Sequence, residues 1–337
     1  MKQTKTVSLF LVLILSATLF GCSFSELVAT EEYSSEEEVA TNEAIDESEG
    51  SAAVGENGQV ARQHLEALTN IGARWSGSAE EMETGQYIAD AFDAMGYGSE
   101  RQTFSATSED GEAINSANII AVKEGSSSQV IVVGAHYDSS DEGLGTDDNG
   151  SGVAVLLETA ELVADQTTPY TIYFIAFGGE EAGLLGSYEF VSSLSDSEIS
   201  DIILFVNMDS ISIGDVTYAY SGSDSTALDW SVDWAGSNGY ALEPIQNADL
   251  STDGEGTADY AAFDDAGIPW VYFEATNWDL GEQDGYTQVD TQYGDNGAII
   301  HTEYDDLAYF DEVLPGRVDR NLDLYISVLY AILTEYE

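Results

Sequence analysis

The chain has 337 residues, with 63 acidic residues against only 8 lysines and arginines, and its formal net charge is −55 at pH 7. So large a negative charge disfavours nucleic acid and anionic lipid surfaces as partners, because both repel acidic proteins. Cys22 is the only cysteine, which excludes a disulfide within one chain.

The N-terminal residues have the pattern of an export signal. Lys2 and Lys5 precede an apolar run over residues 7–20, which is shorter than a membrane span requires. Cys22 follows a small residue at the end of this run, as in a bacterial lipobox, so residues 1–22 predict a signal peptide with lipidation of Cys22. A conventional signal peptide with an incidental cysteine is the alternative. Residues 23–56 are rich in Glu, Ser and Ala and predict a disordered acidic tether.

Residues 57–337 have the alternating pattern of an α/β domain. Apolar β-branched runs predict strands over residues 118–122, 130–135, 171–177, 202–208, 216–220 and 268–273. Helical periodicity predicts helices over residues 60–71, 80–95, 152–164, 184–194, 227–235 and 317–333. We therefore expect a single domain with a mixed, mostly parallel sheet that helices cover on both faces.

Five metal-binding side chains fall at the ends of these strands or on short loops: His136, Asp147, Glu181, Asp209 and His301. Two imidazoles and three carboxylates exceed what one tetrahedral zinc needs, and they fit a site in which one carboxylate bridges two cations. Taken singly, each residue is explained as well by a turn, a helix start, a strand-end cap or a core histidine. Their occurrence together indicates a metal-dependent hydrolase.

The neighbours of these side chains fit the same chemistry. Glu180, beside Glu181, is free to take a proton from a metal-activated water. Asp138 and Asp305 lie two and four residues after the histidines, where a carboxylate can accept the second N–H of the imidazole and fix its tautomer.

These motifs, VIVVGAHYDSSDEGLGTDDNGSG, FIAFGGEEAGLLGS, ILFVNMDS and AIIHTEYDDL, resemble those of the M28 family of di-zinc aminopeptidases, from about Gln59 to the C-terminus. The resemblance implies that His136 and Asp209 bind one zinc ion, that Glu181 and His301 bind the other, and that Asp147 bridges both. It also implies Glu180 as the general base and a cis peptide bond between Asp147 and Asp148.

The segment over residues 256–270 departs from the family pattern. Tyr260 stands where the family usually has a histidine, and the usual positions of the family's tyrosine near the reacting carbonyl hold other residues. Asp259, Tyr260 and Tyr304 are therefore the candidates for substrate or oxyanion contacts. Packing of Tyr260 in a substrate wall is the alternative.

Together these features predict an exported aminopeptidase, lipid-anchored or secreted, with two Zn²⁺ per chain and peptides with a free N-terminus as substrates. The alternatives are a carboxypeptidase or dipeptidase, a glutaminyl cyclase with one zinc, and a non-catalytic surface lipoprotein that binds metal or peptide. Because the acidic residues are spread throughout the chain, we also expect adaptation to salt, which screens their mutual repulsion.

Overall fold

The computed structural model describes residues 58–107, 111, 113–246, 258–281 and 285–336. The predicted signal peptide with Cys22 and the predicted tether over residues 23–56 lie outside these residues. Within the described part, no helix combines the length and the apolar character that crossing a membrane would require.

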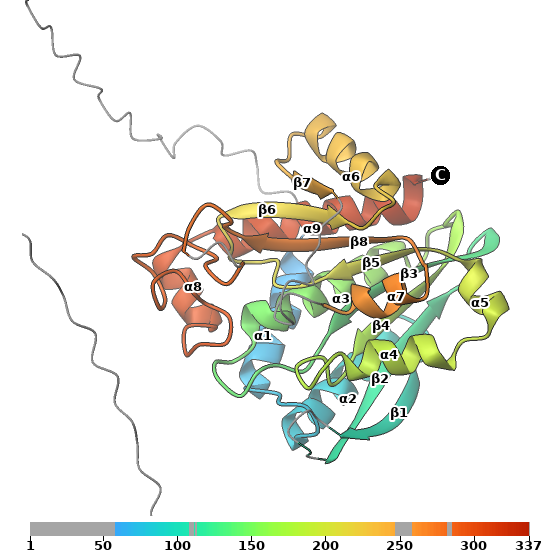
Figure 1. Cartoon of the computed structure of the whole chain (residues 1–337), viewed down its shortest axis with the longest axis horizontal. Coiled ribbons are helices and arrows are strands. Elements are labelled where there is room, and N and C mark those ends of the chain that lie inside the picture. The colour runs from blue at the N-terminus through green and yellow to red at the C-terminus, as the bar shows by residue number, and fades with distance from the viewer. Residues whose placement is uncertain (1–57, 108–110, 112, 247–257, 282–284, 337) are drawn as a thin grey trace, which may run out of the picture. The chain divides into compact units, whose positions relative to one another are not determined.

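A sheet of eight strands in the order β1-β2-β4-β3-β5-β8-β6-β7 runs through the domain (Figure 1). Its strands are β1 (Glu100–Thr107), β2 (Ala113–Lys123), β3 (Ser127–His136), β4 (Tyr170–Phe177), β5 (Ile202–Met208), β6 (Val216–Ser221), β7 (Glu243–Gln246) and β8 (Trp270–Thr276). The central strands β4, β3, β5 and β8 are parallel, whereas β2 and β6 pair with them in the antiparallel direction. The predicted mixed, mostly parallel sheet is confirmed.

Helices cover both faces of the sheet (Figure 1). One face is packed by α1 (Gln59–Ile71), α2 (Ala79–Ala94), α3 (Gly152–Val163), α6 (Thr226–Ser237), α8 (Leu307–Val313) and α9 (Arg317–Glu335). The opposite face is packed by α4 (Leu185–Ser193) and α7 (Tyr260–Asp265), with α5 (Asp196–Asp201) beside them. The helices on both faces are therefore confirmed as well.

The central strands are buried on both sides, as their continuous apolar runs require. In β3, Ile131 and Val133 pack into the core below α3 and α9, whereas Val130 and Val132 pack into the core on the α4 and α7 side. This alternation points successive residues to opposite faces. At the carboxyl end of each central strand, the side chain that follows the last core residue can therefore project beyond the edge of the sheet.

Within the described residues, the two strands and three α-helices that the sequence did not predict are short or lie at an edge. Strand β1 has the partly exposed pattern of an edge strand, and β7 has four residues. Helices α5, α7 and α8 have six or seven residues, fewer than two helical turns, so they carry too little periodicity to stand out in a sequence.

Candidate metal centre

The predicted metal-binding side chains meet at the carboxyl ends of the central strands. His136 is the last residue of β3, Asp209 directly follows β5, and Glu180 and Glu181 lie on the loop after β4. Because these strands are parallel neighbours, their carboxyl ends lie at one edge of the sheet. His301 reaches the same place from the long segment between β8 and α8.

Two groups of three side chains have the arrangement of metal ligands. The first consists of His136, Glu180 and Asp209, and the second of Asp148, Glu181 and His301. Within each group, one ligand atom from each residue lies within 4.8 Å of the other two. All but His301 are buried or half-buried.

Asp148 joins the two groups. Its Oδ1 lies 3.1 Å from His136 Nε2, and its Oδ2 lies 3.0 Å from His301 Nε2. Each histidine also faces a second carboxylate, Asp209 at 3.3 Å from His136 and Glu181 at 3.3 Å from His301. A carboxylate with one oxygen directed at each histidine has the geometry of a ligand that bridges two cations.

The structure corrects the predicted role of Asp147. Its Oδ1 accepts hydrogen bonds from the backbone N–H and the hydroxyl of Ser212, both at 2.7 Å, and its Oδ2 accepts one from Gln288 Nε2 at 3.1 Å. The carboxylate therefore points away from the histidines. Burial raises the pKa of Asp147 to about 7, against the hydrogen bonds from Ser212.

The predicted cis peptide bond is also displaced by one residue. It joins Asp148 to Asn149 and not Asp147 to Asp148. Asn149 belongs to the turn that leads into α3, where its side-chain oxygen accepts a hydrogen bond from the backbone of Gly152 at 2.9 Å and its Nδ2 donates to Met208 at 2.8 Å. Counting back from the start of α3 thus identifies Asp148, and not Asp147, as the acid that faces the centre.

Asp138 supports both His136 and the glutamate loop. Its Oδ1 lies 3.6 Å from His136 Nδ1 and accepts a hydrogen bond from the backbone N–H of Glu180 at 3.0 Å, and its Oδ2 accepts one from the backbone N–H of Glu181 at 3.2 Å. It also accepts a hydrogen bond from Ser76 at 2.6 Å. As predicted, Asp138 therefore lies beside the imidazole of His136. It also holds the backbone of the loop that carries Glu180 and Glu181.

The carboxylate of Asp305 binds the backbone of the loop that carries Asp147 and Asp148, and not the ring of His301. Its two oxygens accept hydrogen bonds from the backbone N–H of Asp147 at 2.6 Å and of Asp148 at 3.3 Å. The structure shows no contact between its carboxylate and the imidazole of His301 among the described residues, so the expected partnership is wrong. Asp305 instead connects the segment after His301 to the loop that carries Asp148.

The carboxylates of the site favour positive charge on both histidines. Burial lowers the pKa of His136, but the charges of Asp209 and Glu180 outweigh it and raise the pKa well above its ordinary value. Hydrogen bonds with Asp148 and Glu181 raise the pKa of His301 to about 12. Such an excess of negative potential is what a divalent cation neutralises.

The donor set itself fits metal ions. Imidazole nitrogens and carboxylate oxygens are ordinary zinc ligands. Glu181 Oε1 is buried and has no hydrogen-bond partner among the described residues, which is costly unless another group contacts it. A cation at the second group would satisfy this oxygen.

Of the predicted substrate contacts, Asp259 interacts electrostatically with His136, Asp209 and Asp138. It is fully buried at the start of α7, and burial raises its pKa to about 7, against the charge of His136. Tyr260 is also buried and stacks on Trp270 with ring centroids 4.2 Å apart, while Tyr304 packs against Tyr309 at 5.0 Å. Ring packing is therefore what the structure shows for both tyrosines.

Two residues near the centre carry no sequence signal that could have identified them. Gln288 bonds Asp147 through its Nε2, and its Oε1 accepts hydrogen bonds from the backbone N–H of Ile299 at 3.0 Å and of Ile300 at 2.9 Å, directly before His301. The ring of Tyr286 lies 6.0 Å from that of His301. Both belong to a segment without regular secondary structure, where periodicity gives no guidance.

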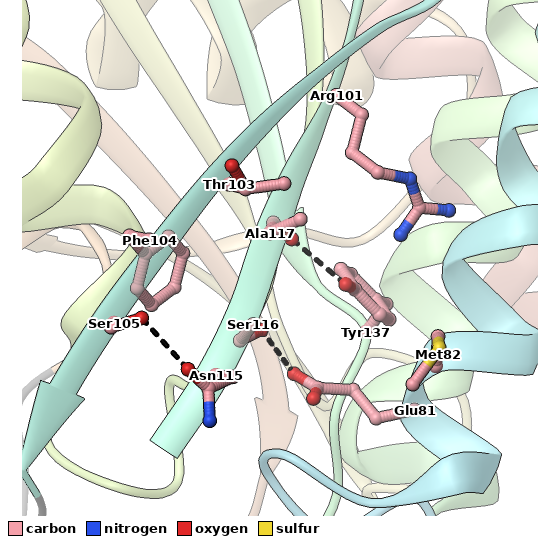
Figure 2. Close-up of a pocket in the computed structure, with 10 residues that line it drawn as sticks. All are labelled: Glu81, Met82, Arg101, Thr103, Phe104, Ser105, Asn115, Ser116, Ala117 and Tyr137. Atoms are coloured by element: carbon pink, nitrogen blue, oxygen red, sulfur yellow. Dashed lines mark hydrogen bonds between the residues drawn. The ribbon is translucent and has the colours of Figure 1, made fainter. Parts of the chain in front are cut away.

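A separate pocket of 430 Å³ lies beside the centre, between α2 and the strands β1 and β2 (Figure 2). Glu81 lines it, with one oxygen accepting a hydrogen bond from Ser116 at 2.5 Å and the other from the backbone of Gly77 at 2.6 Å. Burial and the charge of Asp138 raise the pKa of Glu81 to about 7. Tyr137, which directly follows His136, forms another wall of the pocket and donates to Ala117 at 2.8 Å.

Comparisons with known proteins agree with this geometry. The pattern of peptidase family M28 matches residues 118–326. The alkaline phosphatase isozyme conversion protein of Escherichia coli is 32% identical over 294 residues, which span 78% of this chain and 85% of that protein. Leupeptin-inactivating enzyme 1 of Streptomyces exfoliatus is 32% identical over 81% of this chain and 60% of its own length.

Among solved structures, a zinc aminopeptidase from Bacillus subtilis has the same fold, with a TM-score of 0.67. The alignment covers 82% of this chain and 96% of that one at 19% sequence identity.

Proposed function

Because this chain belongs to peptidase family M28, we propose that it is an aminopeptidase that uses two zinc ions to hydrolyse the first peptide bond of its substrates. The observation that carries this proposal is Asp148, whose two oxygens each face the histidine of a different ligand group. His136, Asp209 and Asp148 would hold one zinc ion, and Glu181, His301 and Asp148 would hold the other. Zinc at these positions supplies Lewis-acid polarisation of the substrate carbonyl and a lowered pKa for the attacking water.

Glu180 is the general base. Burial and the nearby charges of Glu181, Asp259 and Asp209 raise its pKa well above the ordinary value, against the charge of His136. A carboxylate with a raised pKa accepts a proton from the attacking water more readily and can release it to the leaving amine. Asp138 accepts a hydrogen bond from the backbone N–H of Glu180 and so holds the loop that carries this carboxylate.

The acidic surroundings suit a substrate with a free N-terminus. A free α-ammonium group is attracted to the carboxylates around the first ligand group, whereas a blocked amine or a C-terminal carboxylate is not. This favours an aminopeptidase over the carboxypeptidase alternative. Two histidines, each facing Asp148 and one further carboxylate, likewise favour two zinc ions over the single zinc of a cyclase.

The test is to assay the purified protein against aminoacyl and N-acetylated chromogenic amides, before and after chelation. We expect cleavage of the free aminoacyl amides only, loss of activity on chelation, and recovery with Zn²⁺ or Co²⁺. Elemental analysis should find two zinc ions per chain. Full activity with one tightly bound metal, or cleavage of the N-acetylated amides at the same rate, would contradict the proposal.

We also propose that the protein works outside the cytoplasm, anchored by lipid on Cys22 or secreted. Lys2, Lys5 and the apolar run over residues 7–20 support export, and the cysteine at the end of that run supports lipidation. Expression of the full chain and of Cys22→Ala, followed by fractionation and mass spectrometry, tests this. A Cys22→Ala protein that stays with the membrane to the same extent would contradict the anchor.

A further inference from the structure

Arg101, on β1, has no protein partner that neutralises its charge. Among the described residues, its guanidinium forms neither an ion pair nor a hydrogen bond. The other lysines and arginines in this part of the chain each bind a carboxylate, a backbone carbonyl or a side-chain amide oxygen, namely Arg62, Arg74, Lys123, Arg317 and Arg320. In a chain with 63 acidic residues against 8 lysines and arginines, a guanidinium without a partner is unusual. Its N–H donors are free to bind a ligand.

Arg101 lines the pocket between α2 and the strand pair of β1 and β2 (Figure 2). Along β1, Arg101, Thr103 and Ser105 are exposed and alternate with half-buried residues, so their side chains project from one face of the strand. Ile119, opposite Arg101 on β2, packs into the same core as Ile88 of α2. The exposed face of β1 is therefore the face toward α2, and a ligand in the pocket can reach Arg101.

Helix α2 leaves room for the guanidinium. A Cβ added at Gly85, in the interior of α2, would lie 3.4 Å from Arg101 Nη1 and 3.1 Å from the hydroxyl of Tyr137. Glycine in the interior of a helix destabilises it relative to alanine. The helix thus has a destabilising residue at the point where these two side chains approach it.

The remaining walls of the pocket suit an organic molecule. Met82, which lines the pocket from α2, is 63% exposed, and Ala117 lies on the opposite side on β2. Farther along β1, the hydroxyl of Ser105 donates to Asn115 Oδ1 at 2.7 Å (Figure 2). The volume of 430 Å³ falls within the range of about 300–1,000 Å³ that small-molecule pockets have. A cation, an exposed apolar side chain and hydroxyl groups together fit an organic anion better than an inorganic one.

The pocket is separate from the metal centre. Tyr137 packs into the core on the α2 side, and because side chains alternate along a strand, His136 projects to the opposite side. Glu81 also lines the pocket, but Ser116 and Gly77 already donate hydrogen bonds to its two oxygens. The charge that is available to a ligand is therefore that of Arg101.

We propose that this pocket is a second binding site, for a small carboxylate with an apolar body, such as an acylated amino acid. The guanidinium of Arg101 binds the carboxylate through paired hydrogen bonds, the geometry in which the two groups match. The apolar body of the ligand lies against Met82, and its polar end lies toward Ser105. The site does not depend on the proposed aminopeptidase function, because none of its residues binds metal.

The experiment measures the binding of N-acetyl-leucine, and of N-acetyl-leucinamide as its uncharged counterpart, to the full-length, zinc-loaded protein by NMR titration at fixed ionic strength. The wild type should bind the acid at least about 10-fold more tightly than the amide, because charge-assisted hydrogen bonds with the guanidinium require a carboxylate. In Arg101→Gln this preference should be lost. Arg320→Gln is the matched control, because it removes the same charge from an exposed position on α9 outside the pocket, and it should keep the preference.

Three results would overturn the second site. A preference for the acid that persists in Arg101→Gln would place the carboxylate at the zinc ions and not in the pocket. A loss of the same size in Arg320→Gln would show that only the net charge of the protein matters. Equal affinities of the wild type for the acid and the amide would show that Arg101 binds no carboxylate. Arg101 is exposed, so its replacement should leave the fold intact, and zinc content and circular dichroism verify this for each variant.

Discussion

The assignment of Asp148, and not Asp147, as the bridging ligand can be tested sharply, because the two residues are adjacent and have the same side chain. In Asp148→Asn, an amide nitrogen replaces one of the two oxygens that face His136 and His301, so one ligand group loses its shared carboxylate. Changes in residues that only orient a ligand typically lower metal affinity by about 10- to 100-fold, and removal of a bridging ligand should cost more. We expect this variant to keep fewer than two zinc ions and to lose activity.

Asp147→Asn should behave differently. Its amide oxygen can still accept both hydrogen bonds from Ser212, but its amide nitrogen then faces the donor Nε2 of Gln288. Gln288 cannot turn over to relieve this contact, because its Oε1 accepts from Ile299 and Ile300. One buried hydrogen bond is lost and a donor is left unsatisfied, a cost of about 1–3 kcal/mol in the free energy of unfolding.

The assay combines elemental analysis after dialysis with urea unfolding of the zinc-loaded proteins. We expect two zinc ions and a lowered free energy of unfolding in Asp147→Asn, and loss of zinc in Asp148→Asn. The reverse pattern, with zinc lost from Asp147→Asn and retained in Asp148→Asn, would refute the assignment of the bridging carboxylate.

Three further predictions concern the base, a buried acid and the net charge. Glu180→Gln should retain both zinc ions while kcat falls by at least about 100-fold, since only proton transfer is removed; near-normal kcat would exclude Glu180 as the base. The pKa of Glu81 is raised by burial to about 7, so its contribution to stability is complete below about 4.5 and is lost as pH rises through about 7. Glu81→Gln cannot ionise, so its free energy of unfolding relative to wild type should rise between pH 5 and 8 by up to about 3 kcal/mol, and a constant difference in urea unfolding would contradict this. The thermal midpoint should rise between low salt and about 1 M NaCl as the Debye length shortens to about 3 Å, and a flat or falling midpoint in chloride would refute salt adaptation.

The fold class and most of the site follow from sequence patterns. Long apolar runs such as those of β3 and β5 predict central strands, because only buried strands need such continuous apolar character. Parallel strands bring their carboxyl ends to one edge, so the sequence predicts that His136, Glu181 and Asp209 lie together. The joint occurrence of these residues also indicated the peptidase family.

Which of the neighbouring carboxylates face the metal centre, and which groups the others bind, depends on the tertiary fold. Asp147 and Asp148 have the same chemistry, and the backbone of the turn before α3 selects between them. Asp305 and Gln288 act through a partner that is distant in sequence, because Asp147 lies 158 positions from Asp305 and 141 positions from Gln288. Local patterns report periodicity and turns, whereas these contacts depend on strand order and on the path of long loops, which a single sequence does not encode in any local signal.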